Sequence, residues 1–226
     1  DVGAGAGHFV KALERLKINC TGYEPSKYLV KIGNKKIKKN KLINLSLEEM
    51  QNVFSINEDT LSKKEKKIKQ KVVKPKVKNS INVLSLIGVL EHLQNIESLM
   101  TKFTESKINY LYISVPIFSL SVFIENVFHK VFPRQLVGGH THLYTKESLN
   151  FFAKKWNLEI VGEWWFGQDF LDMYRSILLS QKSYNKKKFT QFLDKNLFNY
   201  IDKLQNVLDK NMACSEAHII FLKKNN

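Results

Sequence analysis

The feature that most constrains this chain is the glycine-rich stretch at its start, Asp1-Val2-Gly3-Ala4-Gly5-Ala6-Gly7. Apolar residues at helical spacing follow at once, so the stretch predicts a strand end that passes through a tight turn into a helix over residues 9–16. Glycine suits such a turn because it adopts positive φ and because its missing side chain lets a ligand lie directly on the backbone. The free N–H groups at the start of the helix would face that ligand.

The spacing of the glycines separates two classes of cofactor. A dinucleotide fingerprint requires G-x-G-x-x-G, and its third glycine would stand at His8 in one frame and at Val10 in the other. The pattern D-x-G-x-G-x-G instead resembles motif I of the class I S-adenosylmethionine-dependent methyltransferases. In that family the glycines pass under the methionine and ribose parts of the cofactor. The resemblance implies that the cofactor is S-adenosylmethionine and that it contacts Asp1, Gly3, Ala4, Gly5 and Gly7.

A second acidic residue supports this interpretation. The short apolar-leaning run over residues 18–23 ends at Glu24, directly before Pro25. A carboxylate at the tip of the second strand can accept two charge-assisted hydrogen bonds from the vicinal ribose hydroxyls. A glutamate occurs at this place in the family, and the alternative is a solvated turn residue. Beside the glycine turn, we assign Glu24 and Pro25 to the cofactor site.

Residues after the expected third strand are candidates for contact with the adenine ring. Residues 41–45 predict a short strand, and in the family the residues that follow it reach the adenine. This implies Leu45 and Ser46. A simple helix N-cap explains Ser46 equally well, because Glu49 follows it at capping-box spacing.

The strongest further resemblance lies in the segment V-L-E-H-L at residues 89–93. The nearly unbroken apolar run before it suits a parallel strand buried on both faces, which turns at Gly88 into a helix that continues over 96–103. The segment resembles the one after the fourth strand in the methyltransferase subgroup that includes ubiquinone-biosynthesis O-methyltransferases. This implies that Ile87 and Gly88 border the cofactor and that His92 lies near the methyl-transfer pocket. The alternative is that Glu91 and His92 only cap the helix.

His140 and His142 stand in G-G-H-T-H-L-Y-T, between the expected fifth strand (110–116) and sixth strand (158–166). This stretch also resembles the family. Because histidine titrates near neutral pH, either side chain could take the proton of an acceptor hydroxyl or hold the acceptor. Packing of both against the loop is the alternative. The pair could also ligate a metal, but no carboxylate or cysteine stands at a supporting spacing, so we expect no metal site.

The resemblance implies an α/β fold, with a Rossmann-like, seven-stranded, mostly parallel sheet and helices on both faces. Residues 1–226 are expected to form a single methyltransferase domain. The first strand is expected to be largely missing, since the sequence opens at the acid of motif I, as in an N-terminally truncated chain. The last strand, over 217–222, is expected to be antiparallel at the sheet edge. The lysine-rich segment 57–79 is expected to be a mobile insertion.

The composition and net charge limit the classes of binding partner that this chain can have. The chain of 226 residues has a net charge of +15, almost all from lysine, which allows nucleic acid, an anionic membrane surface or an acidic substrate as partner. Nucleic-acid readers rely on arginine forks and stacked aromatics, which these lysines lack, so we expect no nucleic-acid partner and leave peripheral membrane contact and oligomeric state open. Two cysteines form no disulfide framework and no signal peptide is recognisable, which favours a cytoplasmic protein.

The implied reaction is methyl transfer to a small-molecule, sugar or lipid-linked acceptor. An aromatic and apolar stretch over 117–132 could form a lid that suits a lipid-linked acceptor. Trp164 and Trp165 point to opposite faces of a strand, and one of them, with Gln168 and Asp169, is expected at the substrate mouth. The alternatives are a quinone-like acceptor, an RNA methyltransferase favoured by the charge, or an inactive scaffold that keeps the fold.

Overall fold

The structure, a computed structural model of the whole chain, describes residues 1–39, 41–46, 49, 82–129, 131, 133–136, 139–181 and 185–224. The expected insertion at 57–79 lies outside these residues. The strands are β1 (Gly22–Glu24), β2 (Leu42–Asn44), β3 (Val83–Ile87), β4 (Tyr110–Pro116), β5 (Leu158–Phe166) and β6 (Glu216–Lys223). The α-helices are α1 (His8–Arg15), α2 (Lys27–Ile37), α5 (Ile96–Glu105), α6 (Leu120–Val127), α7 (Lys146–Lys155), α8 (Asp169–Ser180), α9 (Lys186–Asn196) and α10 (Ile201–Lys210).

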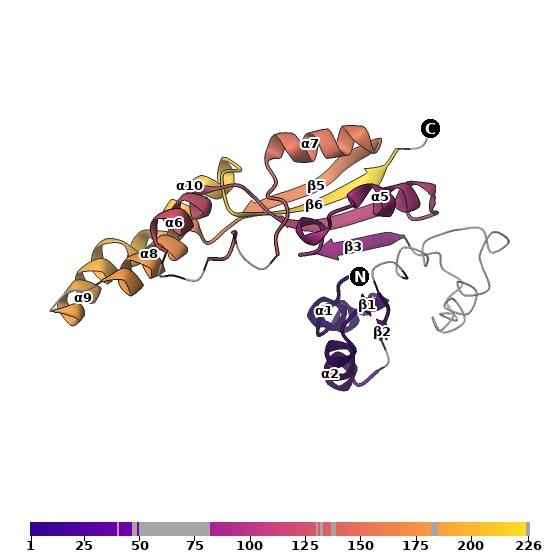
Figure 1. Cartoon of the computed structure of the whole chain (residues 1–226), viewed down its shortest axis with the longest axis horizontal. Coiled ribbons are helices and arrows are strands. Elements are labelled where there is room, and N and C mark those ends of the chain that lie inside the picture. The colour runs from indigo at the N-terminus through magenta and orange to yellow at the C-terminus, as the bar shows by residue number, and fades with distance from the viewer. Residues whose placement is uncertain are drawn as a thin grey trace.

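The strands form a mixed, mostly parallel arrangement (Figure 1). β1 pairs with β2 in parallel, and the larger sheet has the order β3-β4-β6-β5. Val2 joins the two parts, because it forms parallel bridges to Tyr23 of β1 and to Leu86 of β3. The described residues therefore contain six strands rather than the expected seven, and the place of the first strand is taken by the bridges of Val2.

The last strand is antiparallel, as expected, but it does not lie at the sheet edge. β6 pairs with β4 on one side and with β5 on the other, so β5 is the edge strand. Ile219 and Phe221 of β6 are fully buried on one face of the sheet. An inner strand loses water from both flanks of its backbone, and its hydrogen-bonding groups are then satisfied on both sides.

The core lies between the larger sheet and the helices that cover it. Leu86, Leu111 and Ile113 of the parallel strands are fully buried, and they belong to one cluster with Leu99 and Phe103 of α5. The apolar stripe of α5 follows helical spacing, which is why this helix covers the sheet. Burial of the parallel strands leaves their carboxyl ends as the places where loops and polar side chains emerge.

Gly33 and Asn34 are residue types that often end a helix, and the sequence predicts such a stop after residues 27–32, but α2 continues past them. Gly33 is buried, and a Cβ there would lie 2.2 Å from a side-chain carbon of Leu42 and 2.8 Å from the carbonyl oxygen of Ala6. The glycine thus permits close packing of α2 on β2 and on the glycine turn. The side chain of Asn34 exchanges two hydrogen bonds with the backbone of Leu42, each of 2.8 Å. The helix ends instead at Lys38, which has a φ of 59°.

Two helices that the sequence pattern predicted as continuous are interrupted. After Gly88 the chain forms only a short 3₁₀ turn, η2 (Leu90–His92), and α5 starts afresh with the side chain of Asn95 as its N-cap. Apolar residues at helical spacing predict a second continuous helix over 186–208, which the structure divides into α9 and α10 at the 3₁₀ turn η3 (Phe198–Tyr200). The break turns the chain so that α10 packs against α8 and β5.

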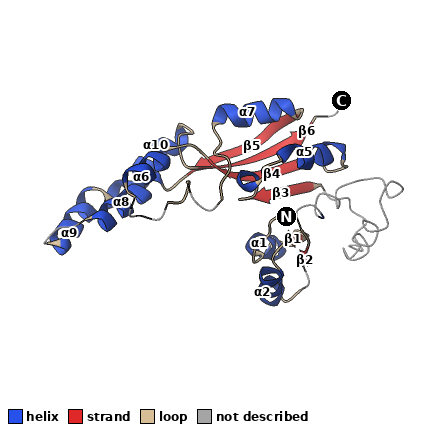
Figure 2. Cartoon of the chain, in the orientation of Figure 1, coloured by secondary structure: helices blue, strands red, loops and turns tan. Residues whose placement is uncertain are grey.

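Helices α6, α8, α9 and α10 form an extension that projects from one end of the sheet (Figures 1 and 2). We call this group the helical extension. The carboxylate of Asp169, at the start of α8, is completely buried within it. No helix within the described ranges has the length and apolar content required to cross a membrane.

Candidate functional site

The glycine turn has the backbone geometry that its sequence predicts. Gly3, Gly5 and Gly7 have φ values of 69°, 53° and 73°, which L-residues with a side chain rarely adopt. A Cβ on Gly5 would meet no atom within 4 Å, whereas a Cβ on Gly3 would lie 2.6 Å from a methyl carbon of Val89. Gly5 therefore borders open space, and Gly3 permits contact with the segment after β3.

Glu24 lies directly across this turn. Its side chain is buried, with an exposed fraction of 7%. One carboxylate oxygen accepts the N–H of Gly5 at 2.8 Å, and the other accepts the N–H of Ser26 at 2.9 Å. Each oxygen has two lone pairs, so each keeps acceptor capacity for a further donor. The structure thus brings the carboxylate and the turn together, as the sequence analysis required.

The remaining predicted cofactor residues surround these two groups. The carboxylate of Asp1 accepts a hydrogen bond from the hydroxyl of Ser85 at 3.0 Å, and Leu45 is buried beyond the end of β2. The carbonyl of Pro25 accepts from the Asn44 side chain, while Ala4 donates its N–H to Tyr23. Ile87 ends β3, and Gly88 follows it with a φ of 64°.

Ser46 has a structural partner. Its hydroxyl accepts the N–H of Glu49, and the Glu49 carboxylate accepts the N–H of Ser46, at 3.2 and 2.9 Å. These are the reciprocal bonds of a capping box, which accounts for the serine without a ligand.

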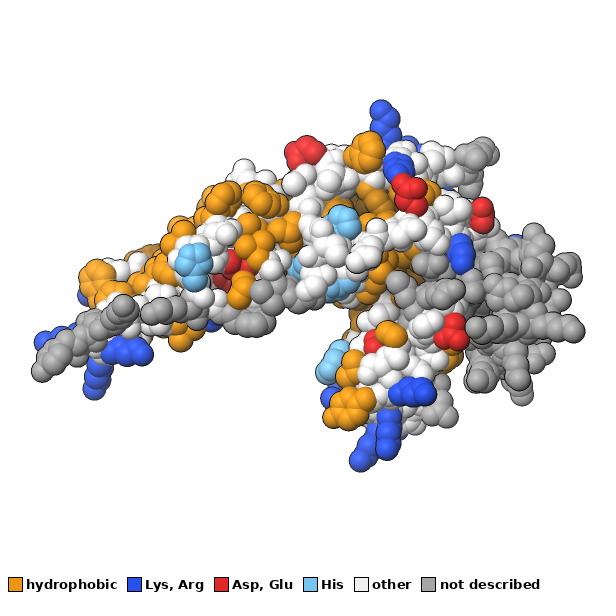
Figure 3. Space-filling view, viewed as in Figure 1, with side chains coloured by type: hydrophobic (Ala, Val, Ile, Leu, Met, Phe, Trp, Pro, Cys, Tyr) orange, Lys and Arg blue, Asp and Glu red, His pale blue; other side chains and the backbone are white. Residues whose placement is uncertain are grey.

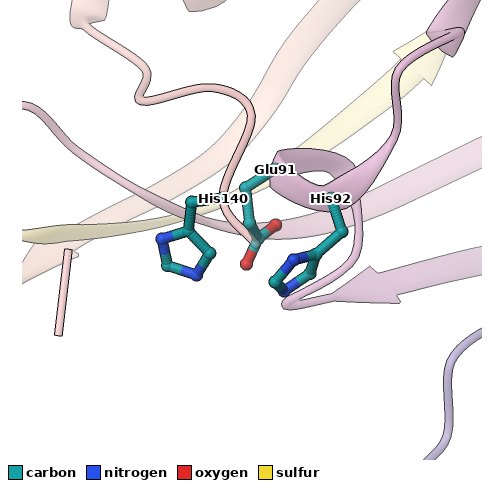
Figure 4. A group of neighbouring side chains, drawn as sticks. All are labelled: Glu91, His92 and His140. Atoms are coloured by element: carbon teal, nitrogen blue, oxygen red, sulfur yellow. The ribbon is translucent and has the colours of Figure 1, made fainter. Parts of the chain in front are cut away.

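A second group of side chains lies just beyond the contact between Gly3 and Val89. Glu91, His92 and His140 each offer one ligand atom, and these atoms all lie within 4.8 Å of one another (Figure 4). Glu91 and His92 come from η2, and His140 comes from the loop before α7. Thr141 fastens this loop to η2, because its N–H and its hydroxyl both donate to the carbonyl oxygen of Glu91, at 2.7 and 2.9 Å.

The hydrogen bonds of the two histidines define which ring nitrogen remains free. Nδ1 of His92 lies 3.3 Å from the carbonyl oxygen of Gly139, and Nδ1 of His140 lies 3.0 Å from that of Gln135. A carbonyl oxygen only accepts, so Nδ1 is the donor in both rings. In the neutral form, Nε2 of each ring then carries a lone pair. The ring centroids are 4.9 Å apart.

Glu91 is the least satisfied member of the group. Its exposed fraction is 4%, and one of its two carboxylate oxygens has no hydrogen-bond partner. Burial raises the pKa of this carboxyl above its ordinary value, while His92 and His140 act in the opposite direction. The nearby hydroxyl of Tyr144 is also buried without a partner, and burial together with the charge of Glu91 raises its pKa.

His142 does not join this group. Its Nδ1 lies 2.7 Å from the hydroxyl of Thr141, and the side chain is exposed. His140 and His142 are two positions apart in the sequence, which predicted that they act together. In the fold, the side chain of His140 instead lies beside those of Glu91 and His92. The signal that could have found Glu91 was its position directly after a buried parallel strand, where loops from neighbouring strands meet.

Asp169, which was expected at the substrate mouth, has other surroundings. Asp169 is fully buried and accepts hydrogen bonds from Ser119, Ser121, Gln205 and Ser215, so it belongs to the core of the helical extension. Trp164 and Trp165 do point to opposite faces. Trp165 packs on the core, and Trp164 is 44% exposed and stacks on Tyr112.

A family model of a methyltransferase domain matches residues 1–163. The chain belongs to the class I S-adenosylmethionine-dependent methyltransferases. No curated protein matches it significantly by sequence.

Solved structures agree on the fold of this methyltransferase. A SAM-dependent methyltransferase from Archaeoglobus fulgidus is 16% identical with a TM-score of 0.56, and the match covers 99% of this chain and 84% of that one. Geranyl diphosphate C-methyltransferase from Streptomyces coelicolor, solved with Mg²⁺, geranyl diphosphate and S-adenosyl-L-homocysteine, is 10% identical with a TM-score of 0.53, and the match covers 99% of this chain and 72% of that one. Magnesium protoporphyrin IX methyltransferase from Synechocystis, solved with S-adenosylhomocysteine, is also 10% identical with a TM-score of 0.53, and the match covers 99% of this chain and 73% of that one.

The residues of the glycine turn fit the methyltransferase cofactor, S-adenosylmethionine. Gly5 borders open space at a positive φ, and a buried carboxylate with spare acceptor capacity lies across from it. The open space at Gly5 allows a ligand to lie against the backbone, and the Glu24 carboxylate can accept hydrogen bonds from the two ribose hydroxyls of the cofactor.

Gly5→Ala is expected to weaken binding of S-adenosylhomocysteine by at least about tenfold, since the new methyl group enters the open space and the left-handed backbone costs about 1–2 kcal/mol. Titration calorimetry measures the binding and thermal unfolding the stability. Gly162→Ala is the matched control, because its Cβ would make an ordinary contact 3.7 Å from Ile220. Unchanged affinity in Gly5→Ala would contradict the placement of the cofactor on this turn.

Proposed function

We propose that this methyltransferase moves the methyl group of S-adenosylmethionine to an oxygen of a small-molecule, sugar or lipid-linked acceptor. The observation that carries the proposal is the position of Glu91, His92 and His140 directly beyond Val89, which contacts the glycine turn. A cofactor held on the turn would direct its sulfonium group toward a cluster of polar side chains. His142, two positions after His140 in the same loop, would be a further group that contacts the acceptor.

The cofactor would be held by backbone and carboxylate contacts. Gly3, Ala4, Gly5 and Gly7 would line its methionine and ribose, and Glu24 would accept hydrogen bonds from the ribose hydroxyls. Asp1 and Pro25 would hold the glycine turn and Glu24 in position. The adenine ring would be bordered by Leu45, Ser46, Ile87 and Gly88. Bound there, the cofactor supplies an already reactive methyl group, so the chain contributes chiefly alignment of the acceptor with it.

Exposed apolar side chains favour an acceptor with a large apolar part. Phe118 and Phe123 follow β4 at its carboxyl end, are 48% and 58% exposed, and contact each other edge to face. Val127, Leu179 and Phe192 of the helical extension are also exposed. Figure 3 shows hydrophobic side chains gathered along this extension. Such a surface suits a lipid-linked or polyisoprenoid acceptor and also permits peripheral contact with a membrane.

Methyl-donor consumption tests the acceptor class. The protein is incubated with S-adenosylmethionine and, separately, with lipid-linked sugars, quinone precursors and total RNA, and formation of S-adenosylhomocysteine is measured. We expect turnover with an oxygen-bearing small molecule and none with RNA. The charge of +15 favours the RNA alternative, which predicts methylated RNA and retention that falls steeply with salt. Binding of the cofactor without turnover on any acceptor, cell extract included, would identify a scaffold.

A further inference from the structure

We propose that Glu91, His92 and His140 bind a divalent transition-metal ion that coordinates the acceptor oxygen beside the cofactor. The inference rests on the proposed function for the role of the ion, but the site itself rests only on these side chains. Two imidazoles and one carboxylate form a ligand set that proteins use for catalytic zinc and for other first-row divalent ions. Three protein ligands leave at least one coordination position open for an acceptor.

The three ligand atoms already converge. They lie within 4.8 Å of one another, and Figure 4 shows the three side chains as neighbours, two from η2 and one from the loop before α7. Zinc ligands at about 2.0–2.2 Å in tetrahedral geometry are separated by roughly 3.4 Å. Metal binding therefore requires a contraction of up to about 1.4 Å, from 4.8 Å to the ligand separation of a tetrahedral site, which side-chain rotations of His92 and His140 can supply, since neither ring is fully buried.

Both histidines make a hydrogen bond of the kind that metal-ligating histidines make. A ligating histidine usually donates its second ring N–H to a carbonyl or carboxylate, which fixes the tautomer and directs the other nitrogen at the metal. Both rings satisfy this condition through Nδ1, toward the carbonyls of Gly139 and Gln135. The latter carbonyl is held in turn, because the backbone N–H groups of Arg134, Gln135 and Leu136 donate to the carboxylate of Glu125.

The orphaned oxygen of Glu91 provides an independent reason. A buried carboxylate oxygen without a donor is unfavourable, and native proteins rarely keep one unless an ion or a proton compensates for it. The backbone of Glu91 is fixed by Thr141, so the side chain is presented from a rigid turn. A cation between the carboxylate and the two free Nε2 atoms would satisfy all three groups at once.

The ion would act on the acceptor. Coordination of an acceptor hydroxyl lowers its pKa, so its proton passes to solvent and the oxygen keeps the electron pair. That pair forms the new O–CH₃ bond while the S–CH₃ bond breaks, and the electrons of the broken bond remain on sulfur as a neutral thioether. The substrate class that follows is an alcohol, phenol or catechol whose oxygen can reach the open coordination position.

Cobalt titration of the full chain tests the site without an acceptor. Co²⁺ is added to chelator-treated protein, and its visible d–d absorption and stoichiometry are recorded. We expect one Co²⁺ per chain, displaced by Zn²⁺, and a rise in thermal unfolding temperature with added Zn²⁺. Glu91→Gln, His92→Ala and His140→Ala should each weaken binding at least about a hundredfold, because loss of even an outer partner costs about 10–100-fold. His142→Ala, the matched control from the same loop, should keep the spectrum.

Titration of the same samples with S-adenosylhomocysteine separates the two proposals. Cofactor binding without a stoichiometric cobalt spectrum would overturn the metal site and leave the methyltransferase proposal standing. A cobalt spectrum without cofactor binding would overturn the proposed use of the glycine turn and leave the metal site. Cobalt binding that Glu91→Gln leaves unchanged, or that His142→Ala abolishes, would overturn the assigned ligand set. Retained cofactor binding in the variants shows that they are folded.

Discussion

Replacement of Glu24 by alanine is expected to weaken binding of S-adenosylhomocysteine by about tenfold to a hundredfold, which corresponds to losing one or two charge-assisted hydrogen bonds. The carboxylate is buried across from the glycine turn, so no neighbouring water-exposed group can take its place. Glu24→Gln, which keeps one acceptor oxygen but not the charge, should show a smaller loss. Isothermal titration calorimetry of each purified variant measures the effect.

A control must separate ligand contact from loosening of the turn, because Glu24 also accepts the N–H groups of Gly5 and Ser26. Asn44→Ala provides it. The Asn44 side chain donates to the carbonyls of Glu24 and Pro25 and therefore supports the same strand end without offering a carboxylate. We expect this variant to bind within about threefold of the wild type. An equal loss in both variants would show that Glu24 acts only through the backbone.

Replacement of Asp169 by alanine is expected to lower the free energy of unfolding by about 3–5 kcal/mol. The change leaves several buried donors without an acceptor, and each such group costs about 1–3 kcal/mol, part of which is recovered by relaxation and entering water. The donors are the hydroxyls of Ser119 and Ser121 at the start of α6, the side-chain amide of Gln205 in α10 and the backbone N–H of Ser215 just before β6. This one carboxylate therefore connects the helical extension to the sheet. Urea denaturation followed by circular dichroism measures the change.

Asp202→Ala is the matched control, since this aspartate is exposed in the first turn of α10. This substitution should lower the free energy of unfolding by less than about 1 kcal/mol, which is the size of a favourable interaction with the helix dipole. Because the glycine turn lies outside the helical extension, folded Asp169→Ala protein should bind S-adenosylhomocysteine within about threefold of the wild type. Equal destabilisation by both substitutions would contradict the role assigned to Asp169.

Local patterns predicted the features that depend on a few neighbouring residues. The Gly3–Gly7 turn needs positive φ at its glycines, and three of them have it. The bounds of β4 and β5 match the apolar runs. The interruption between α9 and α10 was missed, because helical periodicity continues across it and only packing on α8 and β5 favours the break.

The sequence by itself determined the family, the glycine turn and the acidic residue that faces it, because these are properties of short segments whose backbone requirements few residues satisfy. Only the tertiary structure decided that β6 lies between β4 and β5, that Gly33 serves close packing, and that Glu91 and His92 meet His140 rather than His142. These outcomes depend on contacts between segments far apart in the chain. Spacing along a sequence carries no information about which loops the parallel strands bring to the same end of a sheet.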